Sequence, residues 1–255
     1  INKGWIDGPR IIASGGVSVT GGHGDVDGMS PDLLDKYTSK TICDGPYDCR
    51  RATRRAIKFG ADVIKITATG GVLSNTNAGT EQQFFDDELE AIVGAANTMG
   101  RKVTAHAHGK GGIESALKAG VKSIEHGTYL DEGTARLFKK YDATLVPTVL
   151  AGMTVVDWAT NENFLPPASA KKALEVGPQM QEMLSIAWKN GVNIAFGTDT
   201  GVSKHGDNAQ EFIYMVKAGM GEGDALKAAT VVAAKHIGLD AAIGTLETGK
   251  HADII

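Results

Sequence analysis

The chain has 255 residues, of which 42% are hydrophobic and 22% charged, and its formal net charge is −4. This composition is typical of a globular enzyme, and the slight negative charge argues against a nucleic-acid-binding surface, which would need an excess of positive charge. No stretch approaches the roughly 20 apolar residues that a membrane-spanning helix requires. We therefore expect neither a nucleic acid nor a membrane as a partner.

Short segments rich in Val, Ile and Thr alternate with segments of helical periodicity. The pattern predicts six strands, at residues 9–13, 62–67, 102–107, 122–126, 143–149 and 192–197. It predicts helices from an N-cap at Asp86 to Met99, before Gly120, before Gly191, and over residues 210–217 and 224–237. This alternation predicts an α/β fold with parallel strands, of the (β/α)8 TIM-barrel type, with about six of the eight strands visible.

Both ends of the sequence suggest truncation. The chain opens on Ile1 rather than on an initiator methionine, and residues 250–255 resemble the first residues of a strand. Residues 150–177, which include two consecutive prolines, are predicted to form a long loop that covers the mouth of the barrel.

Two cysteines, Cys43 and Cys49, lie six residues apart and either form a small disulfide or stay free. No second Cys/His pair follows at a spacing that suits a zinc knuckle. We favour two reduced thiols, which would fit an intracellular and cytoplasmic protein.

Four side chains lie near the ends of predicted strands, where a barrel places its catalytic groups: Lys65, His106, His126 and Asp199. Strand alternation puts Lys65 on the face opposite Ile64 and Ile66, pointing into the barrel. The lysine is an ordinary ion-paired residue, a Schiff-base residue, or a lysine that has reacted with CO2 to form a carbamate, and the neighbouring histidines favour the carbamate.

His106 and His108 lie two residues apart on one strand, and His126 follows from the next strand. A single strand histidine is usually a hydrogen-bonded core residue, but three imidazoles at adjacent strand ends favour a site for Zn²⁺, Mn²⁺ or Co²⁺. Asp199 is a helix cap, a metal ligand or a base; beside a metal-bound water it would both ligate and accept a proton.

Three further residues are candidates for contact with a substrate. His23 follows the first predicted strand and either lines the site or caps a turn. Tyr129 lies three residues after His126, and His205 follows Asp199 closely.

These motifs, in this order, resemble the amidohydrolase superfamily, and most of all its metal-dependent carboxypeptidase and Xaa-Pro dipeptidase-like branch, near ochratoxin-type amidases and imidazolonepropionase. The similar segments are Thr20-Gly-Gly-His-Gly-Asp25, Gly60-Ala-Asp-Val-Ile-Lys-Ile66, Ala105-His-Ala-His-Gly109, Ile124-Glu-His-Gly127 and Gly197-Thr-Asp-Thr200. Residues 244–253 resemble the segment that leads from the barrel into a small β-sandwich. The resemblance implies a barrel domain over residues 1–240, lacking its first strands, and the beginning of the β-sandwich segment over residues 241–255.

The resemblance also implies a role for each candidate. The site would hold one or two divalent metal ions, most of all Zn²⁺, with Lys65 as a carboxylated lysine that acts as a bridging ligand. His106 and His126 would be metal ligands, and Asp199 would be both a ligand and the proton shuttle. His108 would be a catalytic residue beside the metal rather than a primary ligand. The implied reaction is hydrolysis of the amide or peptide C–N bond of a dipeptide or N-acyl amino acid by metal-activated hydroxide.

One departure from the family pattern leaves alternatives open. The superfamily's His-x-His pair at the end of the first barrel strand has no counterpart in this sequence. The alternatives are a cyclic-amide hydrolase or deaminase of the same superfamily, a Schiff-base lyase that uses Lys65, and a catalytically incomplete chain that is stable only with a partner or as a homo-oligomer.

Overall fold

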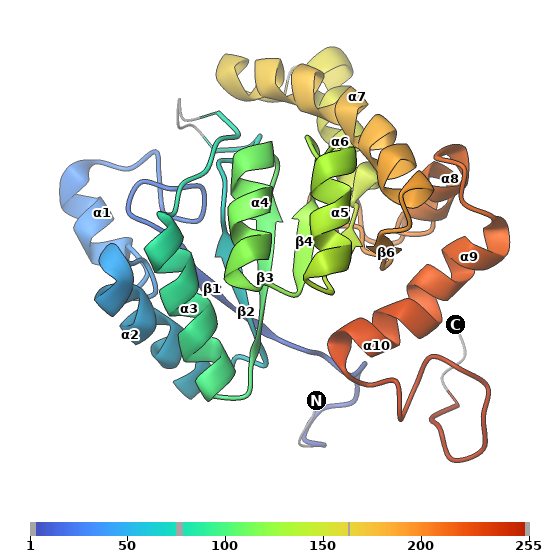
Figure 1. The fold of residues 1–255 in the computed structure, drawn as a ribbon. Coiled ribbons are helices and arrows are strands. Elements are labelled where there is room, and N and C mark those ends of the chain that lie inside the picture. Colours follow the sequence, from blue (N-terminus) through green and yellow to red (C-terminus); the bar gives the residue numbers. More distant parts are fainter. Residues whose placement is uncertain (1–3, 75–78, 163, 253–255) are drawn as a thin grey trace.

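The computed structural model describes residues 4–74, 79–162 and 164–252. In this part of the chain, six parallel strands form one sheet in chain order, as Figure 1 shows. They are β1 (Ser14–Val17), β2 (Val63–Thr67), β3 (Lys102–Ala107), β4 (Ser123–His126), β5 (Thr144–Val146) and β6 (Asn193–Ile194). The predicted α/β class and the parallel order of the strands are confirmed.

Helices connect the strands. They are α1 (Pro31–Tyr37), α2 (Gly45–Lys58), α3 (Asp86–Thr98), α4 (Lys110–Ala119), α5 (Glu132–Lys140), α6 (Val149–Asp157), α7 (Pro167–Lys189), α8 (Gln210–Lys217), α9 (Glu222–Lys227) and α10 (Ala233–Ile237), with π-helical turns at Trp158–Glu162 and Ala228–Val232. Helices α2, α3, α4 and α5 lie side by side on one face of the sheet (Figure 1).

The two faces of the sheet differ in polarity, as the alternation in β2 predicts. Ile64 and Ile66 are fully buried under the helices, whereas Lys65 lies on the opposite face and stays partly exposed. The register pairs Lys65 with Thr104, and Thr67 with His106, so polar side chains from neighbouring strands share the inner face. The hydrophobic outer face holds the helices, and the polar inner face is left for chemistry.

The first strand was predicted in the wrong place. It forms at Ser14–Val17 rather than at residues 9–13, which are irregular. A Cβ atom at Gly15 would lie 2.7 Å from the Cβ of Ala56 and 2.8 Å from that of Ala61. Glycine lowers strand propensity, but here it permits the close approach of α2, which composition alone does not reveal.

The fifth and sixth strands are shorter than predicted. Strand β5 stops at Val146, because Pro147 has no amide hydrogen to donate to the sheet, and Thr148 then takes a left-handed conformation with φ of 50°. The register pairs Asn193 and Ile194 with β5, and the backbone N–H of Ala195 still donates to Leu145 O at 2.9 Å, but residues 195–197 are not part of the strand.

The predicted long loop at residues 150–177 is wrong. The chain forms α6, a π-helical turn and the first half of α7 over this region. Pro167 lies in the first turn of α7, where a missing amide hydrogen costs nothing. A Cβ atom at Gly152 would lie 2.3 Å from Met180 Sδ, so this glycine lets the two helices pack closely rather than marking a loop.

A buried glutamate links the starts of α2 and α3. Helix α3 begins at Asp86, but the cap is Phe85 and not Asp86 as predicted. The Glu88 carboxylate accepts hydrogen bonds from the backbone N–H of Phe85 at 2.8 Å and of Gly45 at 2.6 Å. Two amides that helix geometry leaves without partners are thereby satisfied.

Helix α8 has the predicted bounds, whereas the helix predicted over residues 224–237 is divided into α9, a π-helical turn and α10.

The cysteines are not free thiols. Cys43 and Cys49 form a disulfide with a Cα–Cα distance of 5.0 Å, and both side chains are buried. The first turns of α2 fold Cys49 back toward Cys43, which the linear spacing does not show. The expectation of reduced thiols is therefore wrong, and the cytoplasmic location that rested on it loses that support.

The segment after α10 is irregular. Residues 241–252 form turns without a described strand, and residues 253–255, the end of the predicted β-sandwich segment, lie outside the described residues. The division at residue 240 stays a prediction. No helix in the described ranges combines the length and apolar character needed to cross a membrane.

Candidate metal centre

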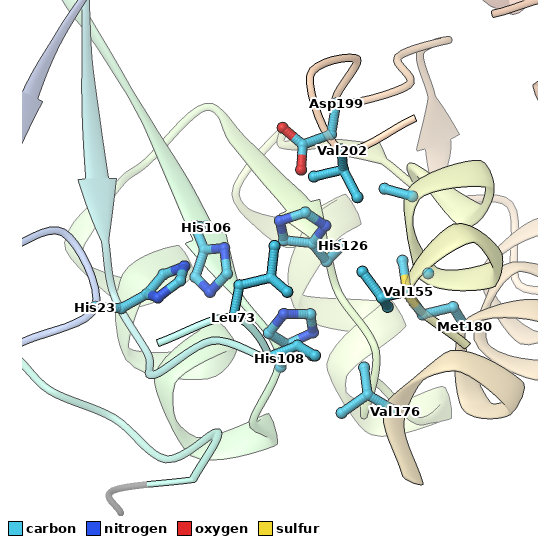
Figure 2. A pocket seen from close by; sticks show the side chains of 13 residues that line it. His23, Leu73, His106, His108, His126, Val155, Val176, Met180, Asp199 and Val202 are labelled. Carbon is cyan, nitrogen blue, oxygen red and sulfur yellow. The ribbon is translucent and has the colours of Figure 1, made fainter. Parts of the chain in front are cut away.

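Three buried histidines meet at the ends of two neighbouring strands. His106 lies on β3, His108 follows that strand, and His126 is the last residue of β4. Their rings lie 4.7 to 4.8 Å apart, centroid to centroid, and one nitrogen from each lies within 4.8 Å of the others. Figure 2 shows these rings around one cavity. The predicted neighbourhood of His106 and His126 is found, and His108 belongs to the same compact group.

Hydrogen bonds leave one nitrogen of each ring for another partner. His106 Nε2 lies 3.2 Å from the carbonyl oxygen of Gly70; a carbonyl only accepts, so Nε2 donates and Nδ1 keeps its lone pair. Thr148 donates its hydroxyl hydrogen to Pro147 O, and so it accepts from His126 Nδ1 at 2.6 Å, which leaves His126 Nε2 with the lone pair.

The third ring is held in a similar way. His108 Nδ1 lies 2.7 Å from Thr128 Oγ1, which leaves Nε2 of this ring uncommitted. Such outer hydrogen bonds orient histidine ligands in metal sites. The three uncommitted nitrogens, one on each ring, therefore match a set of metal ligands.

Unusual backbone geometry directs two of the site's side chains. Strand alternation would point His126 to the same face as Ile124, but φ of 72° at His126 turns its ring toward His106. Asp199 also has a positive φ, of 53°. A left-handed conformation costs a residue with a Cβ atom on the order of 1–2 kcal/mol, so the surrounding contacts must hold both in place.

The electrostatic environment keeps the imidazoles neutral. Burial is the largest cause that lowers the pKa of His106 and His126 well below the usual value, and nearby groups, including Lys65, lower it too. Burial together with neighbouring positive groups lowers the pKa of His108 to about 3. A neutral imidazole offers a lone pair at neutral pH, which a metal ion requires. The donor set thus fits a divalent metal.

Asp199 faces the same cavity from the loop after β6 (Figure 2). It lies at the exposed rim, outside the compact histidine group. Loss of hydration nevertheless raises the pKa of its carboxyl group, and the charge of Lys65 offsets part of that rise. The position suits a group that exchanges protons with a molecule in the cavity.

Lys65 is ion-paired. Its Nζ lies 2.5 Å from Glu125 Oε2 on the inner face of the sheet, and Glu125 also accepts hydrogen bonds from Ser123 and Thr104. The ordinary ion-paired reading of this lysine describes the structure. The Glu125 partner was not anticipated, although its inward position on β4 follows from strand alternation.

His23 lies beside the histidine group, with its ring centroid 4.4 Å from that of His106. Its Nδ1 atom is buried and has no hydrogen-bond partner among the described residues. A buried nitrogen without a partner is costly, and a bound ion or substrate would satisfy it. His23 therefore lines the site, as one of the two readings proposed.

The other two substrate candidates lie elsewhere. Tyr129 and His205 do not line this cavity, and His205 is exposed. The cavity has a volume of about 80 Å³, and one of its walls is apolar. Sequence analysis assigned the residues of this wall to the core or did not single them out. They are Val72, Leu73, Ala151, Gly152, Val155, Val176, Met180 and Val202. Helical periodicity identified α7 as apolar, but it does not tell a core face from a cavity wall.

Comparison with known proteins agrees with this geometry. The family model described as amidohydrolase family matches residues 3–255. The ochratoxinase of Aspergillus niger is 37% identical over 271 aligned positions, which cover all of this chain and 56% of that protein. Its crystal structure superposes with a TM-score of 0.85 at 36% identity, covering 99% of this chain and 60% of that one.

A crystal structure of a Xaa-Pro dipeptidase with bound methionine in the active site has a higher TM-score against this chain than the ochratoxinase structure has. It superposes with a TM-score of 0.93 at 42% identity, covering 99% of this chain and 63% of that one. These superpositions confirm the barrel-type fold. The chain spans 56–63% of the length of these relatives.

Proposed function

The chain belongs to the amidohydrolase family, and we propose that the protein hydrolyses the amide or peptide C–N bond of a dipeptide or an N-acyl amino acid. One observation carries the proposal: three buried, neutral imidazoles place one nitrogen each within 4.8 Å of one another, with the Asp199 carboxyl on the same cavity. The similarity to an ochratoxinase and to a Xaa-Pro dipeptidase supports this reaction class.

We propose Zn²⁺ as the metal, with His106 Nδ1 and His126 Nε2 among its ligands. One nitrogen of His108 lies within 4.8 Å of a nitrogen on each of these rings, so we propose His108 as a further ligand rather than as the catalytic residue that the resemblance implies. Asp199 would complete the set from the rim. Nitrogen and carboxylate donors suit zinc. When bound, the metal would polarise a carbonyl group and lower the pKa of water at the site.

Carboxylated Lys65 is part of the same proposal. The neutral amine would attack the carbon of CO2, forming an N–C bond and releasing one proton to give a carbamate. The position of Lys65 on the inner face, on the strand next to that of His106, supports this role. The carbamate would repel Glu125, so the ion pair seen here must open when the carbamate forms.

Asp199 would move the proton. Water attacks the carbonyl carbon, Asp199 accepts a proton from that water, and the same proton passes to the amide nitrogen as the C–N bond breaks. The products are a carboxylic acid and an amine. The place of Asp199 on the cavity that the three histidines line supports this role.

The apolar wall indicates the substrate. Val155, Val176 and Met180 face the histidines across the cavity (Figure 2). Apolar surface of this kind binds an apolar side chain next to the scissile bond, and it rejects a charged one because of the cost of desolvation. We therefore propose dipeptides or N-acyl amino acids with an apolar group on the acyl side. His23 remains a substrate-binding candidate from within the cavity, and Tyr129 and His205 remain predictions.

The experiment combines metal analysis with a substrate panel. Protein purified with zinc and bicarbonate would be assayed for metal content and for hydrolysis of dipeptides with apolar, acidic or basic N-terminal residues. We expect bound zinc and a preference for apolar residues. Asp199→Asn should lower turnover by about 100-fold or more, the range for loss of a positioned general base.

The matched control is Asp240→Asn, at an exposed turn away from the cavity, which should retain full activity. Zinc-loaded protein that hydrolyses none of the panel, or in which Asp199→Asn behaves like Asp240→Asn, would overturn the proposal.

A further inference from the structure

The loop that carries Asp199 is held by one amide side chain. Asn208 Nδ2 donates to Thr198 Oγ1 at 2.8 Å and to Thr200 Oγ1 at 2.6 Å, and the two hydroxyls lie 2.8 Å from each other. These threonines flank Asp199 on both sides. Asn208 therefore links the two neighbours of Asp199, whose left-handed backbone conformation needs support from surrounding contacts.

The support behind His126 comes from a buried carboxylate. Glu211 is fully buried and accepts hydrogen bonds from the backbone N–H of Val149 at 3.0 Å and of Leu150 at 2.7 Å. These are the first two residues of α6. They directly follow Thr148, whose hydroxyl accepts from His126 Nδ1 and whose backbone is also left-handed.

The two supports belong to one short segment. Asn208 and Glu211 are three residues apart at the start of α8, and the Glu211 amide donates to Asn208 O at 3.1 Å. We infer that the segment from Asn208 to Glu211 is a positioning element that sets the geometry of two site residues. It acts on Asp199, in the loop after β6, through the flanking threonines, and on His126, at the end of β4, through Thr148. The inference deepens the proposed function and rests on it for the identity of the site.

Stability alone does not explain Glu211. No cation pairs with it among the described residues, and burial raises its pKa to about 7 despite the two amide donors. An unpaired buried carboxylate costs stability, and an apolar side chain of similar volume would avoid that cost. The two carboxylate oxygens of Glu211 hold the N-terminus of α6, and with it Thr148, in one position. An apolar side chain has no acceptor and would not do this.

The test is the zinc affinity of Glu211→Gln, measured without substrate by competition with a chromogenic chelator. The amide keeps the volume of the side chain but presents one acceptor in place of two. We expect zinc to bind about 10–100-fold more weakly, the usual effect of losing an outer contact to a metal ligand.

The matched control is Glu88→Gln. Glu88 is likewise buried and likewise accepts from two backbone amides at helix starts, but on the α2–α3 side of the molecule. This variant should bind zinc like the wild type. For the second arm, Asn208→Ala should weaken zinc binding, whereas Asn190→Ala, which removes an amide donor to Ile186 O near the end of α7, should not.

A second readout does not depend on metal. In the apo protein, imidazole NMR should find His126 in the form protonated at Nδ1, and Glu211→Gln should shift His126 toward a mixture of tautomers while Glu88→Gln leaves it unchanged. If the wild type binds no zinc, the proposed function fails and the tautomer shift alone decides this inference. Equal zinc affinities, or an unchanged tautomer, in Glu211→Gln and Glu88→Gln would overturn it.

Discussion

Replacing Glu211 by glutamine should change how the stability of the apo protein depends on pH. Burial raises the pKa of this carboxyl group from an ordinary 4.5 to about 7. Each pKa unit corresponds to about 1.36 kcal/mol. At a pH above both pKa values, ionisation of Glu211 therefore lowers the stability of the folded state by about 3 kcal/mol. Glutamine does not ionise and avoids this cost.

The direction follows from linkage. The folded pKa of Glu211 is raised, so the contribution of this group to stability is fully present below pH 4.5 and is lost as pH rises to about 7. Urea unfolding with chelator present, at several pH values across this range, measures the effect. The free energy of unfolding of Glu211→Gln minus that of the wild type should increase by about 3 kcal/mol from the acid to the neutral end.

Taking the difference between the two proteins isolates Glu211, because the buried histidines titrate in both. The lost hydrogen bond lowers the stability of the variant by about 1 kcal/mol at every pH and leaves the slope unchanged. A difference that stays flat across the range would refute the reasoning, since it would mean that the carboxyl group is not desolvated in the folded state.

Three further changes test separate features of the structure. Gly177→Ala would place a Cβ atom 2.2 Å from Val156 Cγ2 at the α6–α7 contact, so thermal or urea unfolding should register a loss of about 1–3 kcal/mol. Replacing both Cys43 and Cys49 by alanine opens a short loop and should cost about 2 kcal/mol, a loss that reduction of the wild type should reproduce in urea unfolding. Lys65→Met should lower the zinc content and abolish a bicarbonate-dependent mass increase of one CO2 in native mass spectrometry, the sign of the proposed carbamate.

Each of these changes has its own control or refuting result. Gly94 lies in α3, and a Cβ atom added to it would meet no atom within 4 Å, so Gly94→Ala should stabilise the helix by up to about 1 kcal/mol, opposite in sign to Gly177→Ala. A cysteine variant as stable as the oxidised wild type would contradict the disulfide prediction. The absence of the mass increase in the wild type itself would remove carboxylated Lys65 from the proposed function.

Local patterns in the sequence predict much of this fold. The alternation of Lys65 with Ile64 and Ile66 assigns each side chain to a face, because extended backbone directs successive side chains to opposite sides. The order of strands and helices implies a parallel sheet, and parallel strands bring their C-terminal ends to one edge. For that reason the sequence alone predicts that His106 and His126 are neighbours.

Tertiary structure decided what depends on contacts between distant segments. The pairing of Lys65 with Glu125, the closure of the disulfide, and the packing of Met180 against the cavity all depend on how far elements approach one another, which periodicity does not encode. The turn of His126 toward His106 depends on a left-handed backbone that the strand pattern argues against. Thr148 supports that conformation through its hydrogen bond with His126 Nδ1, and Glu211 supports the next residue, Val149. These hydrogen bonds join segments far apart in the sequence, so they form only once the helices have packed.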